Sequence, residues 1–167
     1  MVNRETKDGE PKSSMYPELH SYVALSLEED DPVYTFREQY QKTDIKRVFD
    51  TKVIGKFFCH RSQCGNREWH SNSIAIRIRE YHGNQYNVQV YHQQCSKCKK
   101  PTRAKLDKPI YADRVAYRIK KWNGIEAEQL KLDVETNGAH RAELCERCQK
   151  GHCGKKRRGD KNDASWE

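Results

Sequence analysis

The sequence is poor in the apolar residues that build a folded core. Only 35% of its 167 residues are hydrophobic and 34% are charged. No run approaches the roughly 20 apolar residues of a membrane helix, so we expect no membrane insertion. The first ten residues, MVNRETKDGE, lack the apolar core of a secretion signal, so we expect a protein of the cytoplasm or nucleus, where thiols stay reduced. So small a core offsets little conformational entropy, which indicates a further source of stability.

Positive charge is concentrated after the first 50 residues. Residues 1–50 contain eleven Asp or Glu and seven Lys or Arg, a net charge of −4. Because the whole chain carries +8, residues 51–167 carry +12. Such a field attracts polyanions, and nucleic acid is the first of these to consider. The simpler alternative is a lysine-rich surface that only keeps the protein in solution.

Eight potential metal ligands form four short clusters. Structural zinc takes four thiolate or imidazole ligands, so eight ligands predict two zinc ions, although several pairings satisfy the count. Each ion bound by structural ligands supplies on the order of 10 kcal/mol of folding free energy. The candidate ligands are Cys59 with Cys64, Cys95 with Cys98, His140 with Cys145 and Cys148, and lastly Cys153.

Other uses of the cysteines fit the pattern less well. Seven is an odd number for disulfides, and neither Cys-x2-Cys pair opens a helix after a buried strand, as a redox pair would. A zinc deaminase needs His-x-Glu and a proline before its cysteine pair, but HRAELCERC has another spacing and Leu144 in the proline position. No Ser-His-Asp set, phosphate loop or open three-ligand zinc site is visible, so we expect no enzyme.

The N-terminal part, residues 1–48, is predicted to be an acidic segment that is partly disordered. We expect disorder in the first fifteen residues, which are polar and charged. Apolar residues recur at helical spacing from 17 to 27, and again from 33 to 40, which predicts two short helices.

Strand patterns begin after that segment. Residues 53–59, 73–81 and 86–92 alternate apolar and polar side chains. The turn HGNQ, at 82–85, contains a glycine and an asparagine suited to positive φ and joins the last two strands into a hairpin. The first strand ends at Cys59, and the third leads to Cys95.

One main helix is predicted to start at Pro109 and to stop at Asn123-Gly124. Its apolar stripe consists of Tyr111, Val115, Ile119 and Trp122, and its opposite face offers Arg114, Arg118, Lys120 and Lys121. Residues 125–138 are predicted to be a surface loop. The sequence therefore predicts an α+β zinc-stabilised domain over 49–154, with an antiparallel hairpin or sheet and one main helix, followed by a basic disordered tail at 155–167.

The order of motifs resembles the 3CxxC-type zinc finger family. The motifs are FFCHRSQC, Trp69-x-Ser71, an alternating hairpin, QQCSKC, a helix, and H-x4-CERCQKGHCG, and together they cover about residues 49–154. The family includes the receptor-transporting proteins, the zygote-arrest proteins and many uncharacterised fungal members. The resemblance implies a zinc-binding domain with the eight ligand candidates above, although the first pair has four intervening residues where two are usual. The receptor-transporting branch escorts receptors and has a membrane segment, whereas the zygote-arrest branch binds messenger RNA.

We therefore expect a structural zinc module that binds nucleic acid, with RNA as the leading candidate. Phosphate contacts are expected on an exposed hairpin face, on the loop around the second cysteine pair, and on the run 155–158; the candidates are Arg77, Arg79, Lys97, Lys99, Lys100 and Arg103. Tyr81, Tyr91 or Trp69 are candidates for stacking on bases, with core packing as the simpler role, favoured for Trp69 and Trp122. The alternative function is a protein-binding adaptor or escort, which would present the hairpin edge or the N-terminal segment to a client protein.

Overall fold

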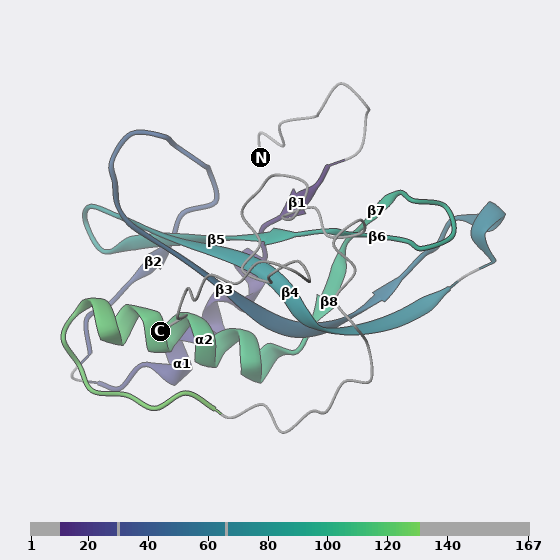
Figure 1. Ribbon diagram of the computed structural model, residues 1–167. Helices are drawn as coiled ribbons and strands as arrows, with labels where there is room; N and C mark the ends of the chain where they lie inside the picture. Colours follow the sequence, from purple (N-terminus) through teal and green to yellow (C-terminus); the bar gives the residue numbers. More distant parts are fainter. Residues whose placement is uncertain (1–10, 30, 66, 131–167) are drawn as a thin grey trace, which may run out of the picture.

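The computed structural model describes residues 11–29, 31–65 and 67–130, which form the predicted α+β fold. Two α-helices lie against one face of a six-stranded sheet with the order β1-β5-β4-β3-β8, and β2 pairs with β5 off this path (Figure 1). Strands β6 and β7 form a separate two-stranded sheet. The elements are β1 (Ser13–Ser14), the 3-10 helix η1 (Pro17–Leu19), α1 (His20–Ser26), β2 (Thr35–Phe36), β3 (Ile45–Phe58), the 3-10 helix η2 (Ser62–Cys64), β4 (Glu68–Tyr81), β5 (Gln85–Tyr91), β6 (Gln93–Gln94), β7 (Pro101–Thr102), β8 (Ala104–Leu106) and α2 (Lys108–Trp122).

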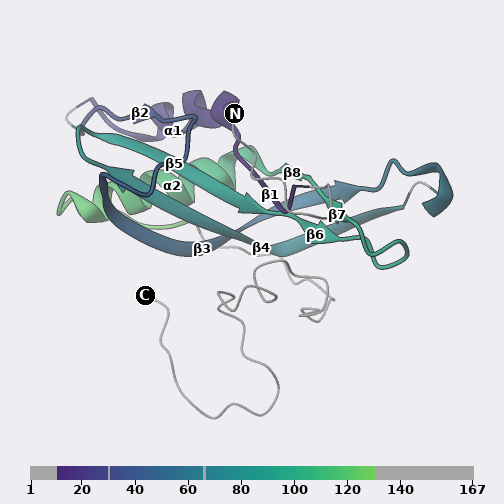
Figure 2. The ribbon, with the colours of Figure 1, turned by 90° about the horizontal axis from the view of Figure 1, so that it is seen from above.

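Two long antiparallel strands, β3 and β4, form the backbone of the sheet. Each has 14 residues, so they extend well beyond the strands expected from the alternating pattern. The turn between β4 and β5 has the predicted positive φ angles, 84° at Gly83 and 53° at Asn84. Figure 2 shows both helices over one end of the sheet, while the segments between β3 and β4 and between β6 and β7 lie at the other end.

The apolar face of the sheet is the one predicted. The alternating residues of β3, β4 and β5 face the helices and are fully buried, as are three residues of the α2 stripe. The fourth stripe residue, Trp122, is partly buried against the same core, as is Trp69. The buried set comprises Val53, Phe57, Ile74, Ile76, Ile78, Tyr86, Val88, Val90, Tyr111, Val115 and Ile119.

Helix α2 begins and ends as its sequence predicts. The Asp107 carboxylate accepts a hydrogen bond from the Ile110 N–H, and the helix stops at Asn123 before Gly124, whose φ is 71°. Its polar face is more covered than expected, because Arg114 is buried and donates to the Leu130 carbonyl. Neither α-helix in the described part of the chain has the length and apolar content needed to cross a membrane.

The N-terminal predictions hold only in part. The helix expected at 17–27 is confirmed as η1 followed by α1, and α1 packs beside α2. The helix expected at 33–40 is wrong, because Thr35–Phe36 forms β2 and pairs in parallel with β5. The Tyr34 hydroxyl donates to the buried Glu80 carboxylate, and such tertiary contacts override weak helical spacing.

The ends of the chain are less fully described. Disorder in the first fifteen residues is wrong for Ser13–Ser14, which pair with β5 as strand β1, and residues 1–10 lie outside the described residues. The loop predicted at 125–138 has no helix or strand as far as Leu130. The remainder of that loop and the predicted tail at 155–167 also lie outside the described residues.

Strand β8 approaches β3 closely at Gly55. A Cβ atom at this position would lie 2.6 Å from the Lys105 carbonyl oxygen and 2.9 Å from the Ile74 Cδ1 atom. Both neighbours are held in the sheet or the core, so neither can move away without disturbing the packing.

We predict that Gly55→Ala lowers the free energy of unfolding by about 1–3 kcal/mol, the usual cost of overpacking. Denaturant titration measures this value. Lys46→Ala, an exposed change on the same strand, is the control and should alter stability by less than about 0.5 kcal/mol. Equal effects of the two substitutions would show that the β3–β8 contact is not as close as described.

Candidate metal centre

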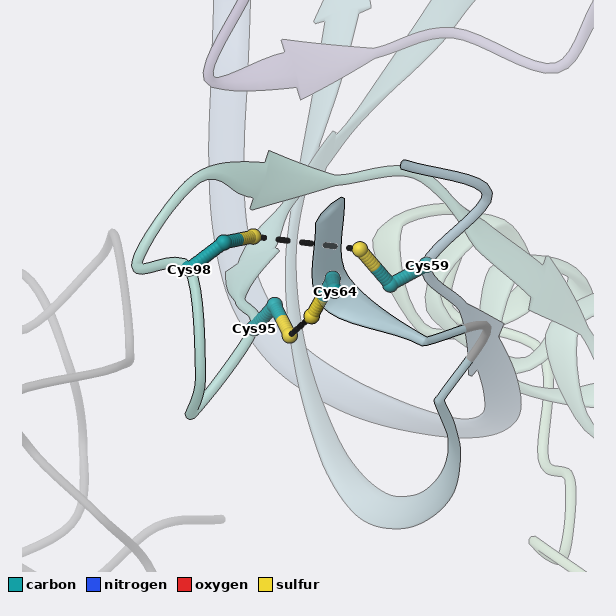
Figure 3. A group of neighbouring side chains, drawn as sticks. All are labelled: Cys59, Cys64, Cys95 and Cys98. Atoms are coloured by element: carbon teal, nitrogen blue, oxygen red, sulfur yellow. Dashed lines mark hydrogen bonds between the residues drawn. The ribbon is translucent and has the colours of Figure 1, made fainter. Parts of the chain in front are cut away.

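Two loops at the far end of the sheet bring four cysteines together. Cys59 directly follows β3 and Cys64 ends η2, while Cys95 follows β6 and Cys98 lies in the turn before β7. Their sulfur atoms all lie within 4.8 Å of one another. Figure 3 shows the four side chains converging from the two loops on one common point.

The two loops share local features that aim the sulfurs inward. The residue after the second cysteine has positive φ in both, 73° at Gly65 and 61° at Lys99. In the second loop the Lys99 N–H donates to the Cys95 carbonyl at 2.8 Å, which closes a tight turn. The wider first loop reaches the same result through η2, so four intervening residues are compatible with a ligand pair.

The distances fit a metal ion better than disulfides. The Sγ atoms of Cys59 and Cys98 are 3.8 Å apart and those of Cys64 and Cys95 are 3.2 Å apart, whereas a disulfide bond is about 2.05 Å long. A zinc–sulfur bond of about 2.3 Å in a tetrahedron separates the sulfurs by about 3.8 Å. Three of the four thiols are buried, and zinc prefers such soft ligands. The cluster therefore fits one tetrahedral zinc ion.

The thiols influence one another's ionisation. Burial disfavours the Cys95 thiolate, but the backbone N–H groups of Cys98 and Lys97 and the Cys64 thiol outweigh it and lower the pKa of Cys95 to about 6. The hydrogen bond to Cys95, together with burial, raises the pKa of Cys64 to about 12. Protein groups alone therefore stabilise thiolates unevenly, whereas a bound cation deprotonates every thiol that ligates it.

Arg61 places a positive charge against the cluster. Its Nη1 atom lies 3.6 Å from the Cys59 sulfur and 3.9 Å from the Cys98 sulfur, and its Nη2 donates to the Pro101 carbonyl at 2.8 Å. The guanidinium thus contacts both loops and offsets part of the negative charge that the thiolates carry. Arg61 was not among the residues predicted from the sequence, although a cation between two ligating cysteines was a usable signal.

Side-chain contacts connect the cysteine loops, which we call the metal end of the fold, to the large sheet. The Trp69 ring stacks on Phe57 with centroids 5.0 Å apart, and its Nε1 donates to the Gln93 side chain at 3.3 Å. Gln93 in turn donates to the Ser71 hydroxyl at 2.9 Å. The Trp69-x-Ser71 motif therefore holds β6, the strand that leads to Cys95. Sequence reasoning missed Gln93, because a glutamine outside any ligand pattern gives no signal.

The structure places half of the predicted ligands. Cys59, Cys64, Cys95 and Cys98 form the cluster. The remaining candidates, His140, Cys145, Cys148 and Cys153, lie outside the described residues.

The hairpin face expected to be exposed is largely occupied. Arg79 is only 7% exposed, donates to the Gln89 side chain, and lies over the Tyr40 ring. Arg77 makes two hydrogen bonds to the Asp50 carboxylate, at 2.8 and 3.0 Å. The expectation of an exposed arginine face is therefore wrong for Arg79. Arg77 is partly exposed but is paired with the Asp50 carboxylate.

The other predicted contact residues lie at the metal end. Lys97, Lys99, Lys100 and Arg103 are exposed on and after the loop that carries Cys95 and Cys98. The aromatic candidates are not available, because Tyr81 and Tyr91 are buried and Trp69 packs on Phe57.

Comparison with known proteins agrees with the metal centre. A family model described as a zinc-binding domain, of the 3CxxC zinc-ribbon type, matches residues 52–151, which is more than half of the chain. The match includes all four clustered cysteines, and also His140, Cys145 and Cys148, while Cys153 lies just beyond it. No curated protein and no solved structure has significant similarity to the chain.

We predict that Arg61→Ala lowers zinc affinity roughly 10- to 100-fold, as loss of a group that supports metal ligands commonly does. Competition with a chelating dye measures this affinity. Arg67→Ala removes the same charge from an exposed position in the same loop and should bind zinc like the unaltered protein. If both variants lose affinity equally, only the net charge of the loop matters, and the described contacts of Arg61 do not.

Proposed function

The chain belongs to the 3CxxC-type zinc-binding domain family, and we propose that it is a non-catalytic module whose metal-bound end presents a basic surface to RNA. Zinc, when bound, cross-links the two cysteine loops. Four cysteine ligands complete the tetrahedral coordination of one zinc ion and leave no position for water, which supports a structural role.

The observation that carries the proposal is the charge of the second cysteine loop. Residues 95–105 contain five Lys or Arg and no acid. All five are exposed, namely Lys97, Lys99, Lys100, Arg103 and Lys105. Several cations held on a rigid, metal-fixed turn form the kind of surface that neutralises phosphates.

The covered surface of helix α2 favours RNA over duplex DNA as the ligand. A helix that reads the major groove must be free on one face, but in α2 only Lys108, Pro109 and Lys121 are exposed. Single-stranded RNA needs only a basic surface and accessible bases. Within the family, the zygote-arrest branch binds messenger RNA, and the basic charge of this chain favours the function of that branch over receptor escort.

A protein-binding adaptor is the second candidate. Two apolar residues of the N-terminal part are strongly exposed, Leu25 at 84% and Val33 at 80%. They lie in or after α1, away from the cysteine loops, and offer a client protein an apolar contact.

We also propose a second zinc ion, bound by the ligand candidates outside the described residues. Elemental analysis should find two zinc ions per chain in the unaltered protein, because eight candidate ligands complete the tetrahedral coordination of two ions. It should find one zinc ion per chain in Cys95→Ser. Cys148→Ser should likewise retain one. A fully loaded protein with a single ion per chain would refute the second site.

For RNA binding, we predict that Lys97→Glu with Lys100→Glu weakens the binding of single-stranded RNA and reduces the log–log salt slope by about 1.4, at about 0.7 for each phosphate contact. Fluorescence anisotropy over a salt series measures both quantities. Lys99 is left unchanged because of its positive φ.

The matched control is Lys42→Glu with Lys46→Glu. Both lysines are exposed near the start of β3, at the end of the sheet opposite the cysteine loops, and the change in net charge is identical. No measurable binding of RNA by the unaltered protein, together with co-purification of a defined protein, would favour the adaptor instead.

A further inference from the structure

A groove with a volume of about 630 Å³ lies beside the metal centre, along β3, β8 and the cysteine loops. Its lining is mostly cationic and aromatic. It includes Lys56, Phe58, His60, Arg61, Arg103 and Lys105. The groove also has one acidic lining residue, Glu68, whose carboxylate lies 3.5 Å from the Nε2 atom of His70.

Two lysines of the groove face each other across neighbouring strands. Lys56 of β3 is the direct register partner of Lys105 of β8, and both side chains are exposed. Neither forms an ion pair with a carboxylate among residues 11–29, 31–65 and 67–130. Like charges directly opposite each other destabilise a sheet, so this pair suits an anion that bridges the two ammonium groups.

The other two cations of the groove have partners within the protein. Arg61 contacts the cysteine sulfurs, and Arg103 lies over the Tyr16 ring at 4.2 Å and 3.8 Å from the Glu18 carboxylate. Their positive charges are therefore partly offset by the cysteine sulfurs and by the Glu18 carboxylate. The two lysines are therefore the residues best placed for direct contact with an anion.

An exposed aromatic ring lies on the same side of β3 as Lys56. Phe58 is two residues further along the strand, so its side chain points to the same face. It is 37% exposed, and the His60 ring lies beside it with centroids 4.4 Å apart. An exposed aromatic ring beside cations gives a nucleobase a surface on which to stack. An acidic peptide would use the lysines but would gain nothing comparable from the ring.

We propose that this groove binds a single-stranded segment of nucleic acid, with its phosphates at Lys56 and Lys105 and an unpaired base on Phe58. The inference rests on the proposed RNA-binding function and names its site. Lys56 and Phe58 were not among the residues predicted from the sequence, whereas Lys105 belongs to the basic stretch 95–105.

The test uses the full chain, loaded with zinc, and a short labelled oligouridine. Lys56→Glu should reduce the log–log salt slope by about 0.7 and weaken binding. The same substitution turns an opposed pair of like charges into an opposite-charge pair, so the melting temperature should rise. Weaker binding by a more stable protein excludes misfolding as the cause. Lys46→Glu, on the same strand but far from the groove, is the control for charge.

Stacking is tested separately at Phe58. Phe58→Leu should weaken oligouridine binding roughly 5- to 150-fold, the range for loss of one stacked base, and should leave the salt slope unchanged. Phe58→Tyr keeps an aromatic ring and should bind nearly as well as the unaltered protein. Zinc content and melting temperature confirm that each variant is folded.

The outcomes separate the site from the function. If the unaltered protein does not bind oligouridine, the proposed function fails, and the groove assignment fails with it. A second outcome is that the unaltered protein binds oligouridine with an affinity that falls as salt rises, while Lys56→Glu and Phe58→Leu bind it as well as the Lys46→Glu control. In that case the function stands and the groove is the wrong site. If polyglutamate competes as well as oligouridine and Phe58→Leu has no effect, the groove is an acidic-peptide surface and the inference is overturned.

Discussion

The metal end of this protein depends on the convergence of four cysteine sulfurs within 4.8 Å. The apolar core lies beneath the helices, and the cysteine loops form a second, smaller cluster beyond it. Four thiolates at this spacing repel one another strongly, and Arg61 offsets only one of their charges. A divalent cation removes that repulsion and holds two loops that are otherwise joined through few apolar contacts. The fold therefore has two sources of stability, a hydrophobic core at one end and a metal centre at the other.

Residues between the apolar core and the cysteine cluster connect the two ends of the fold. Trp69 packs against both the core and the cysteine cluster, and its bond to Gln93 fixes the strand that leads to Cys95. Gly55 allows β8 to lie against β3, which fixes residues 104–106, a short distance along the chain from Cys98. Placement of the sulfurs therefore depends on strand register as well as on the two local turns.

The sequence predicted those features that periodicity and spacing encode. Alternation identified the buried face of β4, and helical spacing identified the buried stripe of α2. Alternation does not reveal whether the opposite face of a strand is covered, so Arg79 was assigned to solvent although Tyr40 and Gln89 lie against it. Strand β2 was missed because its pairing with β5 depends on tertiary contacts. Cysteine spacing identified the clustered ligands, whereas the roles of Arg61 and Gln93 depend on spatial neighbours.

The presence of two sources of stability, the hydrophobic core and the metal centre, also explains where exposed positive charge is tolerated. Opposed lysines such as Lys56 and Lys105 weaken strand pairing, and a domain held only by a small core tolerates few such pairs. At the metal end, cross-linked loops supply stability that does not depend on the surface charge. Cations placed there can therefore remain unpaired with carboxylates and available to a polyanion. The acidic segment lies at the start of the chain, and its described part contacts both ends of the fold, because α1 packs beside α2 whereas Glu18 lies 3.8 Å from Arg103 of the groove. The exposed cations at the metal end therefore support the proposed binding of a polyanion there.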